Sequence, residues 1–410
     1  MRSMISYGRQ TIEEDDIEAV VRALRSDMLT QGPLVEEFEE ALCSYTGAGY
    51  AVVCSNGTAA LHLACLAVGL TEGDGVVTSP ITFLASANAA LYAGATPVFA
   101  DINPLTCNID PKMIEEKVQK TKGVRALIPV HFAGLPCDME GIRRVARRHG
   151  LFVIEDACHA LGAHWRDARG RWRTVGSCSH SDMTVFSFHP VKTMTTGEGG
   201  AITTNDEALY KRLKALRSHG VIKDASLFKR PPDGPWGYEM QGLGFNYRLT
   251  DIQSALGLSQ IKKIDRFVQR RREIASLYKR LFERYHFITT PHAPEGAKSA
   301  NHLYPVRIAF DKIGASKKQW FELMRDIGIG LQVHYIPVHL QPFYQDRFGY
   351  RAGDFPNAEH FYSEEVSLPI YPALTDEDVS TVAAAMISTL ACAVAPRASC
   401  RRGHGLAAGA

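Results

Sequence analysis

The sequence predicts an α/β protein: a large domain with a mainly parallel sheet between layers of helices, and a smaller C-terminal α/β domain. Three observations predict this fold. From about residue 51 onward, short β-branched, apolar runs alternate with helical stretches. Stretches of helix length separate the earlier runs, as the crossovers between parallel strands require. A long helical stretch then leads from this region into a second, shorter α/β portion.

Two helices are expected before the first strand. Residues 12–25 place apolar side chains at helical spacing behind an acidic first turn, which complements the positive end of the helix dipole. Residues 35–47 form the second helix and end at Gly47, because glycine commonly terminates helices. The residues between the two helices are expected to form a loop.

Seven apolar runs are predicted to be strands, because β-branched residues favour extended structure and apolar strands suit a sheet covered on both faces. These runs are residues 51–56, 75–83, 96–102, 124–134, 151–157, 183–190 and 199–205. A tight loop without a helix joins the last two. We therefore expect an antiparallel strand at one edge of the sheet.

The chain is expected to divide into two domains and a tail. Residues 229–248 are rich in Pro, Gly and aromatic side chains, and a helical stretch at 249–285 follows them. This stretch predicts a link between a large domain, residues 1–265, and a small domain, residues 266–391. The remaining residues, 392–410, are small and basic without a periodic apolar face, so we expect a disordered tail.

The composition argues against several classes of protein. With 46 basic and 44 acidic residues the net charge is +2, which predicts neither a nucleic-acid nor a membrane partner. The start of the chain turns acidic where a signal peptide is apolar, and no run reaches the roughly 18 apolar residues of a membrane helix. The nine cysteines are scattered without a CxxC pair. These features predict a cytoplasmic protein with free thiols and no metal site.

The segment VFSFHPVKTMTTGEGGAITTN contains a candidate catalytic lysine. Lys192 lies just beyond an apolar strand, in a loop rich in Gly and Thr. A lysine at the rim of a parallel sheet is partly desolvated, which lowers its pKa and frees the neutral amine to form an imine. The alternative is a solvated loop lysine, which is where most lysines are found.

The segment VIEDACHA places a carboxylate at the end of another strand. Asp156 is therefore expected where open α/β sheets bind their ligands, and its charge suits a protonated pyridine nitrogen. His159 could stack on such a ring or hydrogen-bond to it. The alternatives are a helix-capping aspartate and a core histidine. Together with Cys158 these residues form a single cluster of potential metal ligands, which is weak evidence for a metal.

A phosphate site is predicted after the first strand, where SNGT opens a helix. Free N–H groups and the helix dipole attract a phosphate, Gly57 allows a close approach, and Thr58 adds a hydroxyl. Phe83 follows the next strand and is placed to stack on a flat ring. The alternatives are an ordinary helix start and a core phenylalanine. A phosphate cradle, a stacking ring, a carboxylate and an amine at successive strand ends together indicate pyridoxal phosphate (PLP).

At these positions the sequence resembles the DegT-type sugar aminotransferases, a family of fold-type I PLP-dependent transferases. The blocks SNGTAAL, EDACHA, FSFHPVKTMTTGEGGA and GFNYRLTDIQSALGLSQ resemble family blocks in family order, and the similarity spans residues 4–390. The motifs SHG, NHLYP and QVHY resemble the branch that acts in pseudaminic acid biosynthesis. That resemblance implies amination at C4 of a UDP-linked 4-keto-6-deoxy-N-acetylhexosamine, with L-glutamate as donor and pyridoxamine phosphate as the intermediate cofactor form.

The resemblance also implies roles for individual residues. Lys192 binds the cofactor covalently and moves protons, Asp156 pairs with the pyridine nitrogen, and Phe83 stacks on the ring with His159 beside it. The phosphate is held by Gly57, Thr58 and Ser187, and by Asn246 of a neighbouring subunit, which implies a homodimer. The implied sugar-nucleotide contacts are Tyr7, Asp27, Met28, Leu29, Thr30, Gln332, Val333, His334 and Tyr335.

Other functions remain open at this point. Sugar dehydratases of the same fold have histidine where this chain has Lys192. A regulatory PLP-binding protein without turnover would not need the lysine, the carboxylate and the phosphate loop intact. An amino-acid aminotransferase generally needs an arginine for the substrate carboxylate, for which Arg248 is the one candidate we note. The basic loop 165–175 and the tail depart from the family pattern, and we expect the loop to be a surface hairpin.

Overall fold

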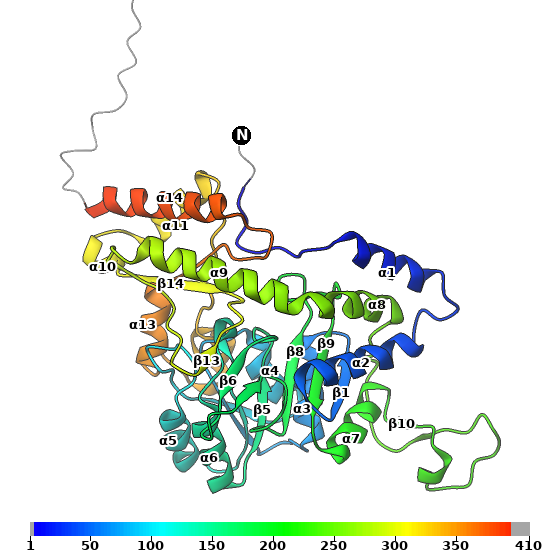
Figure 1. Cartoon of the computed structure of the whole chain (residues 1–410). Coiled ribbons are helices and arrows are strands. Elements are labelled where there is room, and N and C mark those ends of the chain that lie inside the picture. Colours follow the sequence, from blue (N-terminus) through cyan, green and yellow to red (C-terminus); the bar gives the residue numbers. More distant parts are fainter. Residues whose placement is uncertain (1–3, 395–410) are drawn as a thin grey trace, which may run out of the picture.

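The computed structural model describes residues 4–394, which are built around a seven-stranded sheet with helices on both faces (Figure 1). The strand order is β1-β9-β8-β5-β4-β2-β3. The strands are β1 (Tyr50–Cys54), β2 (Gly75–Thr78), β3 (Thr96–Phe99), β4 (Val124–Ile128), β5 (Phe152–Asp156), β8 (Met183–Ser187) and β9 (Gly200–Thr204). Each falls within or overlaps one of the seven predicted runs. The predicted α/β class with a mainly parallel sheet is confirmed.

The antiparallel strand lies in a different place from the one predicted. From β8 to β3 all neighbours are parallel, whereas β9 is antiparallel to both β1 and β8. The predicted antiparallel pairing of the last two strands is confirmed, but β9 is an interior strand and β1 is the edge strand. The tight loop after β8 turns the chain straight back, and β1 then pairs with the free side of β9.

Helices cover both faces of this sheet. Adjacent residues of β1 show the division, since Val53 belongs to one apolar core and Val52 to the other. One face packs against α2 (Pro33–Thr46), α5 (Pro111–Lys120), α6 (Met139–His149) and α8 (Asp251–Gln260), and the other against α3 (Gly57–Ala67), α4 (Leu84–Tyr92) and α7 (Glu207–Arg217). Burial on both faces explains why the strands are apolar along their whole length.

The predicted helices are present with small shifts in their ends. The first is α1 (Glu14–Leu24), which packs against α8, and the second is α2, which ends at Gly47 in the left-handed conformation. The long helical stretch is α8, a 3₁₀ turn at Ile261–Lys263, and α9 (Ile264–Phe282). In Figure 1, α9 runs from the large sheet toward the C-terminal part of the chain.

A separate apolar core lies in that C-terminal part, with members from Ile274 to Leu390. The sheet of this core contains β12 (Ile288–Thr289), β14 (Tyr304–Ile308) and β15 (Glu365–Leu368), and its helices include α10 (Phe310–Ile313), α11 (Lys317–Asp326) and α14 (Asp376–Val394). Helices α12 (Pro342–Phe348) and α13 (Pro356–Glu364) pack instead in a cluster with Phe99 of β3. The domain boundary at residue 265 stays a prediction. Helix α14 includes the first three residues of the predicted tail, and residues 395–410 lie outside the described part.

Two short hairpins extend from the large sheet. The basic loop forms β6 (His164–Arg166) and β7 (Trp172–Thr174), with β13 (Ala297–Lys298) alongside. Its charge is not simply solvated, because Arg171 and Arg173 pair with the buried Asp167. The second hairpin, β10 (Val221–Ile222) and β11 (Glu239–Met240), projects from one side (Figure 1). Within residues 4–394, no helix has the length and apolar character needed to cross a membrane.

Phe38 joins α2 and α8 to the core of the large sheet, and its replacement tests this packing. Its side chain is fully buried and its ring lies 5.4 Å from that of Phe188. Phe38→Ala should lower the free energy of unfolding in urea by about 3–5 kcal/mol, because it leaves a cavity. Phe343→Ala removes a side chain that is 52% exposed, and should change the free energy of unfolding by less than about 0.5 kcal/mol. Equal effects of the two variants would contradict the packing described here.

Candidate active site

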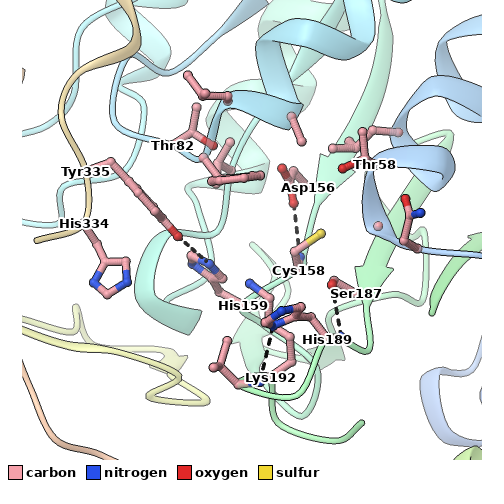
Figure 2. A pocket seen from close by; sticks show the side chains of 18 of the residues that line it. Thr58, Thr82, Asp156, Cys158, His159, Ser187, His189, Lys192, His334 and Tyr335 are labelled. Atoms are coloured by element: carbon pink, nitrogen blue, oxygen red, sulfur yellow. Dashed lines mark hydrogen bonds between the residues drawn. The ribbon is translucent and has the colours of Figure 1, made fainter. Parts of the chain in front are cut away.

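A cavity of about 940 Å³ opens at the carboxyl ends of the parallel strands (Figure 2). Its lining residues follow several strands: Asn56 after β1, Thr82 after β2, Asp156 at the end of β5 and Ser187 at the end of β8. This is the edge at which open α/β sheets bind ligands, because crossover loops there leave a crevice. Another part of the wall comes from the C-terminal part of the chain, including residues 332–335.

Lys192 lies in the loop after β8, with its side chain at the cavity. The backbone N–H of Lys192 donates to the carbonyl of His189 at 2.9 Å, which fixes the turn. Burial lowers the pKa of the Lys192 amine, and the nearby Cys158 and Asp156 oppose that effect more weakly. A larger share of the amine is therefore neutral at a given pH than for a solvated lysine, and only the neutral amine attacks a carbonyl.

Asp156 lies on the opposite side of the cavity from Lys192 in the view of Figure 2. Its carboxylate is buried and accepts hydrogen bonds from the Ser86 hydroxyl at 2.6 Å and the Cys158 N–H at 3.1 Å. Ser86 in turn shares a 2.6 Å hydrogen bond with Thr82. These contacts hold the carboxylate in one orientation, where it can pair with a protonated ring nitrogen.

The start of α3 forms a cradle against the end of β8. The Asn56 side chain caps the helix by accepting from the Ala59 N–H at 2.8 Å. A Cβ at Gly57 would lie 2.9 Å from the Ser187 Cβ, so only glycine allows this approach. Free N–H groups at the helix start, with the Thr58 and Ser187 hydroxyls beside them, suit a phosphate.

Aromatic side chains form the side of the cavity near α4. Phe83 precedes α4, is 58% exposed and lies 6.2 Å from the Tyr335 ring. The Tyr335 hydroxyl and His159 Nε2 are 3.2 Å apart (Figure 2). His159 Nδ1 is buried and has no partner among the described residues. Burial holds the pKa of His159 well below its usual range, so the imidazole is neutral.

His334 forms part of the wall contributed by the C-terminal part of the chain. Its ring lies 5.7 Å from that of Tyr7 and 4.9 Å from that of Tyr335. Burial, together with the charge of Lys192, lowers the pKa of His334 to about 3. The imidazole is therefore neutral at physiological pH and can accept or donate a hydrogen bond without a charge.

The structure brings most of the predicted site residues to this one cavity. Those lining it are Tyr7, Gly57, Thr58, Phe83, Asp156, His159, Ser187, Lys192, Gln332, Val333, His334 and Tyr335. Asp27, Met28, Leu29, Thr30 and Asn246 do not line it. Their individual roles stay predictions.

Contacts within the chain hold these five residues away from the cavity. The Leu29 carbonyl accepts from the Asp251 N–H at 2.9 Å, which ties the α1–α2 loop to the start of α8. Asp27 and Met28 line a second cavity of about 580 Å³ beside α1 and α8. Asn246 is exposed and pairs with Ser218 at the base of the projecting hairpin.

Some cavity residues were not predicted from the sequence. His302 lines the cavity with its ring 4.5 Å from that of His159, and the motif NHLYP is the signal that could have identified it. Ser86 orients Asp156, but an isolated serine in a helix carries no such signal. Tyr247 and His62 also line the cavity. Residues 4–394 contain no group of three or more His, Cys, Asp or Glu side chains arranged to hold a metal ion.

The residues present fit PLP: a lysine for its aldehyde, a carboxylate for its ring nitrogen, a cradle for its phosphate and an aromatic face for its ring. Fold and site together define a PLP-dependent enzyme of fold type I. The chain belongs to the DegT/DnrJ/EryC1/StrS aminotransferase family, whose model matches residues 10–387. It is thus a PLP-dependent aminotransferase, as the sequence predicted.

Curated relatives match this chain over nearly its full length. The UDP-4-amino-4,6-dideoxy-N-acetyl-beta-L-altrosamine transaminase of Campylobacter jejuni strain 81-176 is 40% identical over 388 residues, 94% of this chain and 98% of the relative. The spore coat polysaccharide biosynthesis protein SpsC of Bacillus subtilis is 41% identical over 379 residues, 92% and 95% of the two chains.

Solved structures show the same fold. Helicobacter pylori PseC, an aminotransferase involved in the biosynthesis of pseudoaminic acid, has a TM-score of 0.87 at 35% identity, covering 95% of this chain and 100% of that one. The PLP form of the putative sugar aminotransferase Spr1654 from Streptococcus pneumoniae has a TM-score of 0.85 at 28% identity, covering 96% and 100%.

Lys192→Ala should abolish covalent PLP binding. Borohydride should fix the cofactor on Lys192 in the unaltered protein, as peptide mass spectrometry can show, and the variant should be colourless. Turnover should fall by at least about a thousandfold, because the variant loses both the attachment point and the group that moves protons. Lys211→Ala, on the exposed face of α7, is the matched control and should remain yellow. A yellow Lys192→Ala protein would contradict the assignment.

The lowered pKa of Lys192 predicts how PLP attachment depends on pH. The rate at which PLP attaches to the apoprotein should rise with pH, because the neutral amine reacts, and should reach half its maximum below the ordinary lysine value of 10.5. Asp156→Asn removes a charge that raises this pKa, so the midpoint should move lower still. Stopped-flow absorbance, started by adding PLP to the apoprotein, measures the pH midpoint of the unaltered protein and of Asp156→Asn. A midpoint at or above 10.5 would argue that the amine is solvated.

Proposed function

We propose that this aminotransferase places an amino group on C4 of a UDP-linked 4-keto-6-deoxy-N-acetylhexosamine, with L-glutamate as the donor, as in pseudaminic acid biosynthesis. One observation carries the proposal: Lys192 lines a cavity of about 940 Å³, and Asp156 and the start of α3 line the same cavity. The names of the relatives from Campylobacter jejuni and Helicobacter pylori support the choice of sugar. SpsC, at similar identity, is named for spore coat polysaccharide biosynthesis.

The residues of this chain supply binding and proton transfer. When bound, PLP supplies an aldehyde that holds the amino group and a ring that takes up electrons as a C–H bond breaks. As a free amine, Lys192 would use its Nζ to take a proton from the donor's carbon and, in the second half-reaction, to deliver one to the sugar carbon. Asp156, held by Ser86, keeps a ring nitrogen protonated. Tyr335 and the neutral His159 form a hydrogen-bonded pair at the cavity and would lie near a bound ring.

The C-terminal segment is proposed to recognise the sugar nucleotide. Gln332 and Val333, with His334 and Tyr335, line the cavity opposite the start of α3, and Tyr7 lies beside them. Their aromatic and polar groups suit a sugar with hydroxyl and amide substituents. A cavity of about 940 Å³ is at the upper end of the range for small-molecule sites, so it accommodates a substrate larger than an amino acid alone.

The charge of the cavity also favours a sugar over an amino acid as the specific substrate. Among the residues that the structure describes, none lining the cavity is an arginine, and Arg248 is not part of it. An amino-acid aminotransferase would need such a group to discriminate among carboxylate substrates. The diphosphate and the glutamate carboxylates are proposed to meet residues from a second subunit.

We infer that the enzyme is a cytoplasmic homodimer with a shared active site. Asn246 and residues 27–30 lie away from the cavity of their own chain, so they can serve the site only across a subunit interface. The exposure of Asn246 beside a projecting hairpin supports this arrangement (Figure 1). The described cysteines are all free thiols, as is usual in a reducing compartment.

The substrate proposal is tested with purified enzyme, glutamate and a panel of UDP- and dTDP-linked 4-keto and 3-keto sugars, with products identified by mass spectrometry. We expect kcat/KM for the UDP-4-keto-N-acetyl sugar to exceed that for its dTDP counterpart by at least about tenfold, since the dTDP sugar lacks the ribose 2′-hydroxyl and its contacts, and its base carries an extra methyl group. A preference for dTDP sugars or for a 3-keto carbon would reject the substrate. Release of 2-oxoglutarate with every sugar omitted would instead report the glutamate half-reaction alone.

A further inference from the structure

Behind His334 lies a buried polar pair that the proposed reaction does not use. Glu365 and Ser367 are two residues apart on β15, so their side chains lie on one face of the strand. Their exposed fractions are 0% and 1%. A fully buried carboxyl group is costly unless its hydrogen bonds are satisfied, so its partners indicate what it does.

The side-chain hydrogen bonds of this pair lead to His334. The Ser367 hydroxyl donates to Glu365 Oε1 at 2.6 Å, and the His334 backbone N–H donates to Glu365 Oε2 at 2.9 Å. Ser367 Oγ also lies 2.8 Å from His334 Nδ1. The other ring nitrogen, Nε2, has no hydrogen bond within residues 4–394, and the ring lines the cavity. The chain therefore runs from a buried acid to the substrate side.

The protons in this chain can be placed by counting donors. An ionised Glu365 only accepts, so it takes the single hydroxyl proton of Ser367. Ser367 Oγ can then only accept from His334, so Nδ1 carries the ring proton and Nε2 is a bare acceptor. When Glu365 is protonated, it donates to Ser367, Ser367 donates to Nδ1, and Nε2 carries the proton instead. His334 stays neutral in both states because its pKa is lowered to about 3.

We propose that Glu365, acting through Ser367, is a positioning residue that sets the tautomer of His334. With Glu365 ionised, His334 Nε2 accepts a hydrogen bond from a hydroxyl or amide N–H of the nucleotide-sugar substrate. The identity of that substrate rests on the function proposed above, but the tautomer does not.

The groups around Glu365 decide at which pH it ionises. Burial raises the pKa of Glu365 to about 8. The hydrogen bonds from Ser367 and the His334 N–H, and the charge of Lys317 on α11, lower that pKa but by less than burial raises it. Arg307 is its register partner on β14. The Cys107 thiol and the Tyr335 hydroxyl also face it, and burial raises the pKa of both, which keeps them neutral. Glu365 is thus ionised at about pH 9 and protonated at about pH 6.5.

The variant Glu365→Gln imitates the protonated state. Its side-chain oxygen accepts from the His334 N–H, so its NH₂ group faces Ser367 and donates. The test is ¹⁵N NMR of the holoenzyme labelled at histidine, with the His334 signals assigned from their loss in His334→Gln. At about pH 9 the native protein should show a proton on Nδ1. Glu365→Gln should show it on Nε2 at every pH, and the native protein should approach that state at about pH 6.5.

Two further variants keep the test decisive. Glu364→Gln changes the adjacent carboxylate at the end of α13, which pairs with His360, and should behave like the native protein. Ser367→Ala breaks the chain, so the His334 tautomer should no longer depend on pH or on Glu365→Gln. The proposal is overturned if folded, PLP-bound native protein at about pH 9 and Glu365→Gln show the same tautomer, or if Ser367→Ala still responds to residue 365.

Kinetics test the substrate contact separately. At about pH 9, Glu365→Gln should lower kcat/KM for the keto sugar by about tenfold, because a donor replaces an acceptor. It should leave kcat/KM for glutamate within about twofold, since that half-reaction does not use the contact. If Glu365→Gln changes the His334 tautomer but does not lower kcat/KM for the keto sugar, the proposed hydrogen bond between His334 Nε2 and the substrate is rejected. Failure of the native enzyme to aminate any sugar in the panel would instead reject the proposed function, with the NMR result unaffected.

Discussion

The site depends on how closely the start of α3 approaches strands β8 and β9. A Cβ on Gly200 would lie 2.5 Å from the Asn56 carbonyl oxygen, and one on Gly57 would lie 2.9 Å from the Ser187 Cβ. Two glycines on different elements therefore remove the side chains that would otherwise separate helix and sheet. This approach brings backbone N–H groups of α3 and the Ser187 hydroxyl together, an arrangement that suits a phosphate. It also sets where Lys192 lies, because the same strand leads into its loop.

The opposite wall has a different origin, since it comes from the C-terminal core. Backbone hydrogen bonds between Gln332 and Ser367, at 3.2 and 2.8 Å, hold the segment 332–335 against β15. That attachment brings Tyr335 within hydrogen-bond distance of His159. The part of the cavity that carries the chemistry is thus built on the parallel sheet. The part proposed to select the substrate is built on a second, smaller sheet. Residues of that part can therefore vary without disturbing the residues held by the parallel sheet.

Several polar residues of the site are held by neighbours that do not line the cavity. Ser86 orients Asp156, and Ser367 connects the His334 ring to Glu365. Such residues are hard to find in a sequence, because an isolated serine or a buried glutamate has the same appearance in many structural roles. His302 differs, because its motif was visible in the sequence, although its 4.5 Å approach to His159 was not.

The sequence alone determined the α/β class, the approximate positions of the seven strands and the four groups that fit PLP, because each follows from local composition and from motifs of a few adjacent residues. Only the tertiary structure decided that β9 lies between β1 and β8, since strand order depends on pairing between distant segments. It also showed that residues 27–30 lie beside α8 rather than at the cavity of their own chain. The link from Glu365 through Ser367 to His334 exists only because segment 332–335 packs beside β15, and nothing local to either segment specifies that pairing.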